Sequence, residues 1–358
     1  MHTTAQDATA LAVRALTSAG VPSEAAALQA DLLVDSEMRG LPSHGLLRLP
    51  RLVERIHNGV ANPAETGVHR WIADALLDVD GRDGLGPVVA TAALDKISER
   101  AHSAGIACAE IRASNHLGAL AWYVRRVAAA GQVVVALTTS EAIMHPFGGT
   151  QALVGSNPIA IGVPVDDQRP LVFDMATTLV SMGKVHDYAN RGRDLPPGWA
   201  LNEAGEPTQD AASAKTGALA PFGGAKGYGL AIAFEALVVA LTGTHLGREV
   251  AGTLDSVSRP TKGDVFIVAE PRSGTGQAIA AYLDEVRRSR PSTPGIPVAV
   301  PGDRSDSRRL HSEQHGFEVP DGVWTQIADL AASPHASAAA PAPSPTSADR
   351  SRAQGDSQ

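Results

Sequence analysis

The chain has few aromatic residues and a single cysteine. Phe, Trp and Tyr make up 4% of its 358 residues, whereas hydrophobic residues make up 44%. Its core must therefore be packed largely from aliphatic and small side chains, and the length is sufficient for a core divided between two or three lobes. One cysteine excludes an intrachain disulfide and a cluster of thiolate metal ligands. Cys108 lies in an apolar run, which predicts a buried structural thiol.

The sequence also lacks the charge and the segments that mark several classes of protein. The formal net charge of -8 argues against a general nucleic-acid binder, which needs a basic face. The first residues lack the charged and then apolar segments of a secretory signal. The most apolar helical stretch, residues 229–241, is too short to cross a bilayer and contains Glu235. We therefore expect a cytoplasmic protein with neither nucleic acid nor membrane as a partner.

Three cofactor and metal motifs are missing. The glycines of residues 81–86 follow the order GxxGxG, not GxGxxG, and Arg82 and Asp83 add bulk where a pyrophosphate should approach the backbone. A turn or helix start is the better interpretation. Gly183-Lys184 lacks the remaining residues of a P-loop. The twelve histidines show no HExxH or comparable spacing, so no metal site is predicted.

Apolar periodicity predicts helices throughout the first 58 residues. The expected helices span residues 4–19, a segment from Pro22 to near Gly40, and a segment beginning at Pro42. In the third helix His44 and Arg48 would be one turn apart on the same face. Pro50 can kink this helix.

From residue 71 onward, strand and helix patterns alternate, and the chain ends in a segment of low complexity. The polar, turn-rich residues 190–216 predict a surface excursion, and the helix at 228–241 is expected to be buried. After about residue 333 Ala, Pro, Ser and charged residues dominate, which predicts a disordered tail. We expect strands at 75–79, 105–111, 133–137, 159–163, 171–173 and 265–268, and helices at 85–104, 118–130, 228–241 and 278–288.

Ser114-Asn115-His116 follows a predicted strand and precedes a predicted helix. This is where ligand sites open in α/β proteins, and the positive end of the helix keeps the imidazole neutral. The free amides of the helix suit an anionic cofactor group. A capping or structural role for His116 is equally compatible with the sequence.

Ser43-His44 with Arg48 combines a proton-transfer group, a hydroxyl that can orient it, and a clamp for a carboxylate. A 2-hydroxy or 2-oxo acid requires these groups, because its hydroxyl must lose a proton while its carboxylate is held. Taken alone, these residues also fit a helix with a solvated basic face, which is the more common case.

Two further segments contain candidate binding residues. Residues 222–228 are rich in glycine and enter a helix, where Lys226 can meet a phosphate or carboxylate, or the glycines can simply begin the helix. Asp174 follows a strand and can bind a cofactor hydroxyl or cap a turn, and the sequence alone favours the cap.

Eight segments, in this order, resemble the malate/L-lactate dehydrogenase family from about residue 5 to residue 330. This family includes ureidoglycolate, sulfolactate and diketogulonate dehydrogenases and a cyclic-imine reductase. The segments are Ser43-His44-Gly45 with Arg48, Ser114-Asn115-His116-Leu117-Gly118, Phe147-Gly148-Gly149, Gly155-Ser156-Asn157-Pro158-Ile159-Ala160, Asp174-Met175-Ala176-Thr177, Gly183-Lys184, Gly223-Gly224-Ala225-Lys226-Gly227-Tyr228-Gly229-Leu230 and Pro301-Gly302-Asp303.

The resemblance implies an α/β fold with a family-specific, mixed and largely antiparallel cofactor-binding sheet that is not a Rossmann fold and is flanked by a helical domain. It also implies a homodimer that uses NAD or NADP. The expected regions are a helical segment with substrate-site residues (1–70), an α/β cofactor-binding region (71–290), a segment that packs on the helices (291–332) and the disordered tail (333–358).

The same resemblance assigns roles to site residues. His44, supported by Ser43, is the first candidate for proton transfer, His116 the second, and Lys184 would stabilise a developing alkoxide. The substrate would face Arg48, Ser156, Met182 and Gly183. The cofactor would contact His116, Leu117, Gly118, Ala119, Leu120, Ser140, Asp174, Met175, Ala176, Lys226, Gly302, Asp303 and Arg304.

Five positions depart from the family pattern and bear on substrate identity more than on reaction class. Leu52 stands where an aromatic residue is common, Ser140 where some members have lysine, and Ser156 where threonine is usual. Asp264 and Asp303 replace a histidine and a glutamate.

The sequence thus predicts hydride transfer between NAD or NADP and a small 2-hydroxy or 2-oxo acid. One alternative is reduction of a cyclic imino acid, a branch that resembles this chain but carries aspartate at the position of Lys184. A second alternative is a ligand-binding relative without catalytic activity.

Overall fold

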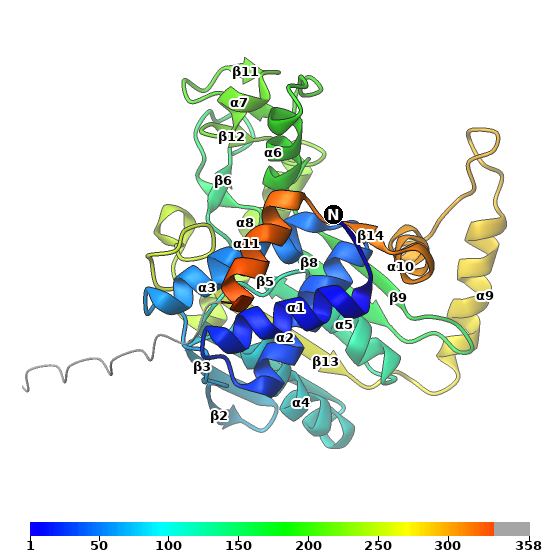
Figure 1. Ribbon diagram of the computed structural model, residues 1–358. Helices are drawn as coiled ribbons and strands as arrows, with labels where there is room; N and C mark the ends of the chain where they lie inside the picture. Colours follow the sequence, from blue (N-terminus) through cyan, green and yellow to red (C-terminus); the bar gives the residue numbers. More distant parts are fainter. Residues whose placement is uncertain (333–358) are drawn as a thin grey trace, which may run out of the picture.

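The computed structural model describes residues 1–332 as a mixed α/β protein, which confirms the predicted class (Figure 1). The predicted tail, 333–358, lies outside the described residues. A central sheet has the strand order β2-β3-β4-β13-β5-β8-β9, in which β3 and β4 run parallel and every other neighbouring pair is antiparallel. Its strands are β2 (Val68–Ala73), β3 (Leu76–Gly84), β4 (Ile106–Ser114), β13 (Gly263–Ala269), β5 (Val133–Thr138), β8 (Ile159–Val163) and β9 (Leu171–Met175).

The sheet is covered on both faces, so its central strands are continuous apolar runs. In β13, Phe266 and Val268 belong to the core shared with α4 (Gly86–Ala104) and α5 (Leu120–Ala129). Val265 and Ile267 point to the other face, where α8 (Ala225–Thr242) packs.

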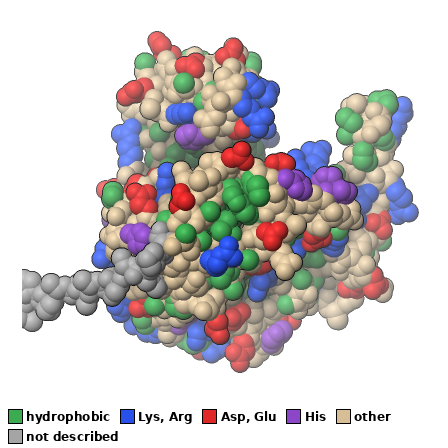
Figure 2. All heavy atoms as spheres, in the orientation of Figure 1, with side chains coloured by type: hydrophobic (Ala, Val, Ile, Leu, Met, Phe, Trp, Pro, Cys, Tyr) green, Lys and Arg blue, Asp and Glu red, His purple; other side chains and the backbone are tan. Residues whose placement is uncertain are grey.

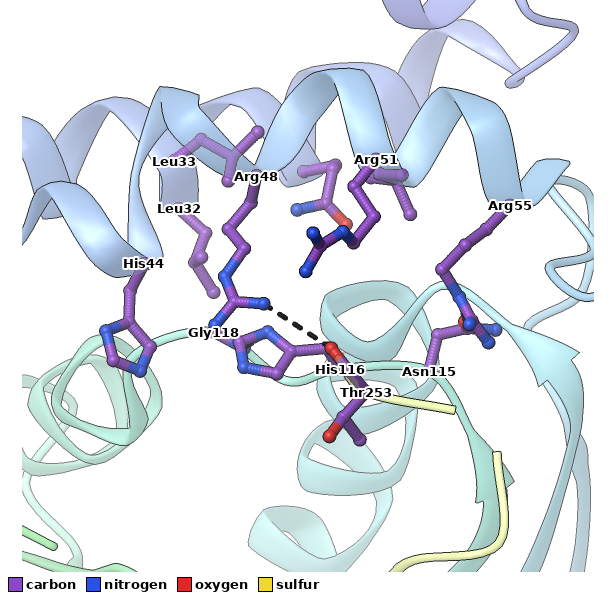
Figure 3. Close-up of a pocket in the computed structure, with 12 residues that line it drawn as sticks. Leu32, Leu33, His44, Arg48, Arg51, Arg55, Asn115, His116, Gly118 and Thr253 are labelled. Carbon is purple, nitrogen blue, oxygen red and sulfur yellow. Dashed lines mark hydrogen bonds between the residues drawn. The ribbon is translucent and has the colours of Figure 1, made fainter. Parts of the chain in front are cut away.

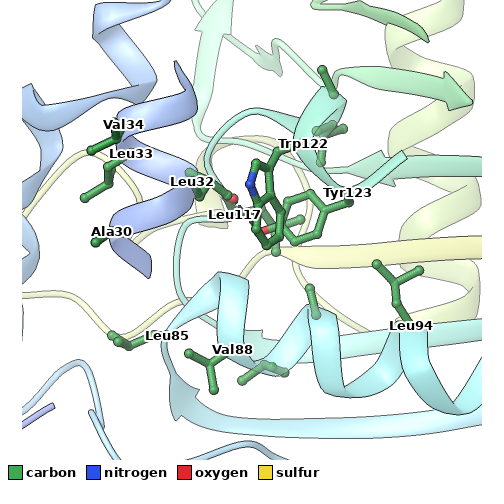
Figure 4. Close-up of a cluster of buried hydrophobic side chains, with 14 of the residues drawn as sticks. Ala30, Leu32, Leu33, Val34, Leu85, Val88, Leu94, Leu117, Trp122 and Tyr123 are labelled. Carbon is green, nitrogen blue, oxygen red and sulfur yellow. Dashed lines mark hydrogen bonds between the residues drawn. The ribbon is translucent and has the colours of Figure 1, made fainter. Parts of the chain in front are cut away.

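A layer of helices lies against α4 and α5. Leu32 of α2 lies on the side of that helix toward Trp122 and Tyr123 of α5, and all three belong to the largest hydrophobic cluster (Figure 4). The C-terminal α11 packs on α1, α10 packs on α2, and β1 (His2–Thr3) pairs with β14 (Phe317–Glu318). The helices of this layer are α1 (Ala5–Ser18), α2 (Ser23–Met38), α3 (Leu49–His57), α10 (Asp303–His315) and α11 (Asp321–Ala332).

Two parts project from this body in Figures 1 and 2. One is a lobe with its own small core around Val185, Leu195 and Leu219 and a second sheet of order β11-β10-β12-β6-β7. The other is an arm formed by α9 (Thr275–Arg288) and the loop after it. Figure 2 shows acidic and basic side chains mixed across this view. The lobe contains β6 (Ala142–Met144), β7 (Val154–Gly155), α6 (Met182–Asn190), β10 (Ala200–Leu201), β11 (Pro207–Thr208), α7 (Ala211–Ala214) and β12 (Ala218–Leu219).

Most of the predicted elements are present. The differences occur where contacts with distant parts of the chain determine the ends of an element or the folding of a loop. The strand at residues 159–163 is confirmed at both ends, whereas β3 and β4 extend further than predicted. The expected excursion at 190–216 is partly folded, because β10, β11 and α7 contribute to the lobe.

The predicted third helix is not continuous. Two 3₁₀ turns, η1 (Pro42–His44) and η2 (Leu46–Arg48), precede α3, and Pro50 lies in the first turn of α3 instead of kinking its middle. Proline at this position leaves no interior hydrogen bond unmade. His44 and Arg48 therefore belong to separate turns, and helical spacing does not explain their proximity.

The expectation that residues 228–241 form a buried helix is only partly correct. Helix α8 has 18 residues, and by length and composition alone it could cross a membrane. It instead packs on the sheet through a narrow stripe that includes Ala231, Glu235 and Val238. The Glu235 carboxylate accepts hydrogen bonds from the Asn157 side chain and the Gly247 backbone, while much of the remaining surface of the helix is exposed.

A buried ion pair joins three strands at one end of the central sheet. Lys262 Nζ lies 2.6 Å from both carboxylate oxygens of Asp264, and the two side chains are 2% and 0% exposed. Asp264 also accepts hydrogen bonds from Ser114 at the end of β4 and Thr138 at the end of β5. The pair therefore links β13 to both of its neighbours.

We predict that Lys262→Met lowers the free energy of unfolding by about 3–5 kcal/mol, because it leaves the Asp264 charge buried without a cation. Urea denaturation measures this change. The matched control is the double variant Lys262→Met with Asp264→Leu, which removes both charges and should be more stable than the single variant. A double variant that is no more stable than the single one would contradict the prediction.

Candidate active site

A cavity of about 600 Å³ opens where the helical layer, the sheet and the lobe meet. Its walls come from segments far apart in the sequence. They include Ser43 and His44 of η1, His116 after β4, Ser140 after β5, Asp174 of β9, and Met182 of α6. A volume of this order is typical of cavities that hold small molecules and cofactors.

His44 is enclosed at the wall of this cavity. Its Nδ1 lies 3.1 Å from Ser43 Oγ, so the hydroxyl can fix the ring orientation. Burial, together with the charge of Arg48, lowers the pKa of His44 to about 4. The ring is therefore neutral at physiological pH and can accept a proton at Nε2 when Nδ1–H donates to Ser43.

His116 faces His44, with the ring centroids 5.7 Å apart (Figure 3). The Gly118 N–H donates to His116 Nδ1 at 3.0 Å. Burial and then the charges of Arg48 and His44 lower the pKa of His116 well below its usual range. A neutral ring whose Nδ1 accepts a hydrogen bond carries its proton on Nε2, so His116 presents a donor to the cavity.

Two backbone carbonyls hold Arg48, and part of its guanidinium remains available to bind a ligand. Its Nε donates to the Ser43 carbonyl at 2.7 Å, and Nη1 donates to the Thr253 carbonyl at 3.4 Å (Figure 3). Within residues 1–332, Nη2 has no hydrogen-bond partner. Burial and the charge of Arg51 lower the pKa of Arg48 to about 10, so it remains a cation at neutral pH.

The loop that carries His116 is fixed by a buried asparagine. The Asn115 Oδ1 accepts a hydrogen bond from Arg55 Nε at 2.8 Å, and Nδ2 donates to the Asp83 carbonyl at 2.6 Å. Gly118 follows with φ of +76°, and a Cβ there would lie 2.3 Å from the Leu32 side chain. Glycine thus lets the loop pass against α2, which brings His116 beneath α3.

The other end of the cavity has features that suit an anionic cofactor. Helix α5 begins without a side-chain cap, and its Ala121 N–H donates to the Asp174 carboxylate at 2.7 Å. Asp174 is accessible from the cavity but otherwise surrounded by protein, and this burial raises the pKa of its carboxyl to about 6. Helix α10 also begins without a side-chain cap, at Gly302, which lines the cavity. The start of α10 presents backbone N–H groups that suit phosphate oxygens. At the start of α5 the Ala121 N–H is already bonded to Asp174, whose carboxylate can accept a hydrogen bond from a cofactor hydroxyl, so these residues fit a dinucleotide.

Comparison with known proteins agrees with this geometry. A family model described as malate/L-lactate dehydrogenase matches residues 3–328. The chain belongs to this family. It resembles a solved dehydrogenase from Sinorhizobium meliloti, with a TM-score of 0.90, 46% identity, and coverage of 93% of this chain and 98% of that one.

Two curated relatives of the family are similar over most of their length. L-sulfolactate dehydrogenase from Methanocaldococcus jannaschii is 32% identical over 325 residues, which is 89% of this chain and 93% of the relative. Delta(1)-pyrroline-2-carboxylate reductase 1 from Burkholderia ambifaria is 32% identical over 322 residues, which is 90% of this chain and 95% of the relative. The family therefore includes members that are named for two different substrate classes.

The structure brings most of the site residues expected from the family resemblance to one cavity. These residues come from seven separate segments of the chain, and no local sequence pattern shows that the segments meet. The expected residues that line the cavity are Ser43, His44, Arg48, His116, Leu117, Gly118, Ala119, Leu120, Ser140, Ser156, Asp174, Met175, Ala176, Met182, Gly183 and Gly302.

Four expected residues do not line the cavity of the single chain. Lys184 and Lys226 are exposed in the first turns of α6 and α8. Asp303 binds Arg287 of α9 through both carboxylate oxygens, and Arg304 is exposed beside it. The proposed alkoxide contact of Lys184 thus has no support from its position.

Sequence reasoning missed Lys262, Thr253 and Glu141, which also line the cavity. The Glu141 carboxylate accepts hydrogen bonds from the backbone N–H groups of Thr253 and Leu254. The aspartate at position 264 could have indicated Lys262, because an acidic residue at the start of a buried strand needs a partner. Lys262 is that partner. The rejected glycine segment, 81–86, does not line the cavity and instead contacts the loop of His116.

We predict that His44 makes folding sensitive to acid. Its folded pKa of about 4 lies below the ordinary 6.5, so the unfolded chain takes up a proton that the folded protein does not. The associated stability is fully present above about pH 6.5 and is lost as the pH falls toward 4.

His44→Gln should therefore reduce the loss of stability between pH 7 and pH 4 by about 3 kcal/mol, as measured by urea denaturation at both pH values. His57→Gln, a change of an exposed histidine in α3, is the matched control. An unchanged pH dependence in the His44 variant would show that the imidazole is not held neutral by burial.

Proposed function

We propose that this oxidoreductase transfers hydride between NAD or NADP and a small 2-hydroxy/2-oxo acid. Family membership supports the reaction class. The observation that carries the proposal is the pair of facing imidazoles beside Arg48, in which His44 can accept a proton and His116 can donate a hydrogen bond.

In the oxidation direction, Arg48 holds the substrate carboxylate through the part of its guanidinium that the protein leaves free. His116 Nε2–H donates to the substrate oxygen, and His44 Nε2 accepts the hydroxyl proton while Nδ1–H donates to Ser43. The carboxylate also offsets the Arg48 charge, which is the second cause of the low pKa of His44. Substrate binding therefore makes His44 a stronger base at the moment when a base is needed.

The cofactor would lie between the starts of α5 and α10, near Asp174 and Gly302. When bound, its nicotinamide supplies the ring that accepts or donates the hydride. We further propose that the predominantly antiparallel central sheet carries this cofactor in place of a Rossmann fold. The absence of a GxGxxG motif from the sequence supports that arrangement.

Reduction of a cyclic imino acid is the second candidate. The similarity to the Burkholderia ambifaria reductase favours it. It would use the same Arg48 clamp, with the substrate nitrogen in place of the oxygen. Lys184 stands where the imine-reducing branch is expected to carry aspartate, and this favours the hydroxy acid.

We predict that the wild-type protein oxidises a 2-hydroxy acid from a panel that includes malate, lactate and sulfolactate, with NAD or NADP as acceptor. His44→Gln should lower kcat by about 10²–10⁴-fold, because the amide cannot take the proton. Absorbance of the reduced nicotinamide measures the rate, and His57→Gln is the control. Absence of turnover with either cofactor, or a full rate in the His44 variant, would reject the proposal, and turnover of a cyclic imine alone would favour the second candidate.

We also propose that the protein is a homodimer in which a second copy covers α8. Leu230, Ile232 and Leu237 of this helix are 42%, 43% and 45% exposed, although the helix is strongly apolar. Apolar surface of this extent on one helix is typical of an interface between protein chains. Lys226 lies in the first turn of the same helix, so an interface there would include it.

We predict that Leu237→Glu converts the dimer to a monomer at micromolar concentration, because it places a charge in the apolar contact. Light scattering during size-exclusion chromatography measures the mass. The matched control is Val68→Glu, which changes an exposed apolar residue of β2. A monomeric wild type, or equal dissociation of the control, would contradict this assignment.

A further inference from the structure

The backbone between His44 and Arg48 determines how these two side chains are placed relative to each other. The two residues end separate 3₁₀ turns, η1 and η2, which meet at Gly45. Figure 3 shows both side chains on the side of this segment that faces His116. Since helical spacing does not fix their separation, another group must hold the junction between the two turns.

The turn η2 has no side-chain cap from the residue that precedes it. The first N–H groups of a helical turn have no partner within the turn, and Leu46 is buried, so water does not supply one. Glu37, in the last turn of α2, supplies the partner, because its Oε1 accepts a hydrogen bond from the Leu46 N–H at 3.0 Å. The Leu47 N–H also hydrogen-bonds to this carboxyl. A side chain from another helix thus caps η2.

Glycine at position 45 makes this contact possible. A Cβ on Gly45 would lie 2.7 Å from the carboxyl carbon of Glu37, which is closer than such atoms approach in proteins. The φ of Gly45 is −96°, which other residues adopt, so the requirement is for space and not for an unusual backbone conformation. Glu37 and the junction therefore pack directly against each other, and a movement of one displaces the other.

Burying a carboxyl at this position has a cost. Glu37 is 7% exposed, and within residues 1–332 no cation pairs with it, because Arg39 on the same helix binds Asp35 and Asp306 instead. Burial raises the pKa of Glu37 to about 7, although the two backbone N–H groups oppose this rise. An apolar side chain would avoid the cost but would leave these buried N–H groups unpaired. The carboxyl is therefore present as an acceptor for η2.

We propose that Glu37 is a positioning residue, which holds His44 and Arg48 at the separation that oxidation of a 2-hydroxy acid requires. It does not line the cavity, and it acts through the backbone of η2. The inference rests on the proposed function, because it takes His44 as the base and Arg48 as the carboxylate clamp. Without the acceptor, the N–H groups of η2 would turn toward other partners, and both side chains would move with the turns.

The test replaces Glu37 by leucine and by glutamine, and measures kcat and KM with malate, lactate and sulfolactate. Glu37→Leu should lower kcat by about 10- to 100-fold, because a displacement of about 1 Å near a reacting group has an effect of this size. It should also raise KM by about 5-fold or more, because Arg48 moves with the same turn. Glu37→Gln keeps an acceptor oxygen and should keep both constants within about 3-fold of the wild type.

The matched control is Gln132→Leu, which also removes a buried polar side chain that bonds to the backbone. Gln132 is 3% exposed, and its amide donates to the Ser98 carbonyl. It precedes β5, whereas Ser140 of the cavity follows that strand, so the two lie toward opposite ends of β5. The control should leave kcat and KM unchanged. Urea denaturation of each variant verifies that it is folded under the assay conditions.

Gly45→Ala tests the same contact from the other side and replaces Glu37→Leu if that variant does not fold. The added Cβ meets the Glu37 carboxyl and should displace the junction. We expect kcat to fall by about 10-fold or more.

A chemical probe gives a readout that does not depend on turnover. Diethyl pyrocarbonate modifies accessible imidazoles, and mass spectrometry of the peptide that contains His44 measures the rate. His44 should react about 5-fold faster or more in Glu37→Leu, because its turn is less firmly held. The rate in Glu37→Gln and Gln132→Leu should equal that of the wild type.

The outcomes separate this inference from the proposed function. Wild-type kinetic constants and His44 reactivity in Glu37→Leu, or equal losses in Glu37→Gln or Gln132→Leu, would overturn the role of Glu37 and leave the dehydrogenase proposal standing. Absence of turnover in the wild type, with faster modification of His44 in Glu37→Leu, would reject the proposed function and retain Glu37 as the group that fixes His44.

Discussion

The site depends on the buried hydrogen bonds that hold the loop after β4. Asn115 connects this loop to Arg55 of α3, and Ser114 connects it to the Lys262–Asp264 pair of β13. The Gly118 N–H then fixes the His116 ring. Arg55, Ser114, Asn115 and Asp264 are buried, so breaking one of their hydrogen bonds would leave a polar atom without a partner, at a cost of about 1–3 kcal/mol. The loop therefore has little freedom, and the helical layer and the sheet are held at one relative position.

This constraint explains how two histidines at one site can differ in chemistry. Both imidazoles are kept neutral by burial and by Arg48, so neither acts as a cation. The difference lies in their Nδ1 atoms, because His116 accepts from a backbone N–H whereas His44 meets a hydroxyl that can also accept. A backbone N–H cannot change its direction of donation, but a serine hydroxyl can. His44 is thus the ring whose outer nitrogen is free to take up a proton.

The charge distribution at the substrate end of the cavity favours an anion. Arg48 and Arg51 lie on one side of the imidazoles, and the carboxylate of Glu141 is already occupied by backbone donors. Lys262 is neutralised by Asp264 within the protein. The positive charge that remains accessible therefore belongs to the arginines of the helical layer, whereas Asp174 and the helix starts lie toward the cofactor end. One end of the cavity therefore suits an anionic substrate, and the other end suits the cofactor.

The amino-acid sequence by itself determined the local elements and the residue types of the site. The runs of β-branched and aliphatic residues at 133–137 and 159–163 specify strands, because such side chains fit a buried pleated surface wherever it lies. The ordered motifs around His44, His116 and Asp174 identified the family, and the family supplied the expected site.

Tertiary structure alone decided how these parts meet. No local pattern places β13 between β4 and β5, since that order depends on pairing across more than a hundred residues. The same holds for the 3₁₀ turns that replace the start of the third helix, the burial of Lys262 and the exposed face of α8. Hydrophobic periodicity reports which side of an element is apolar, but not what covers that side. The tautomer of His116 likewise follows from the Gly118 N–H, a neighbour whose position only the folded chain fixes.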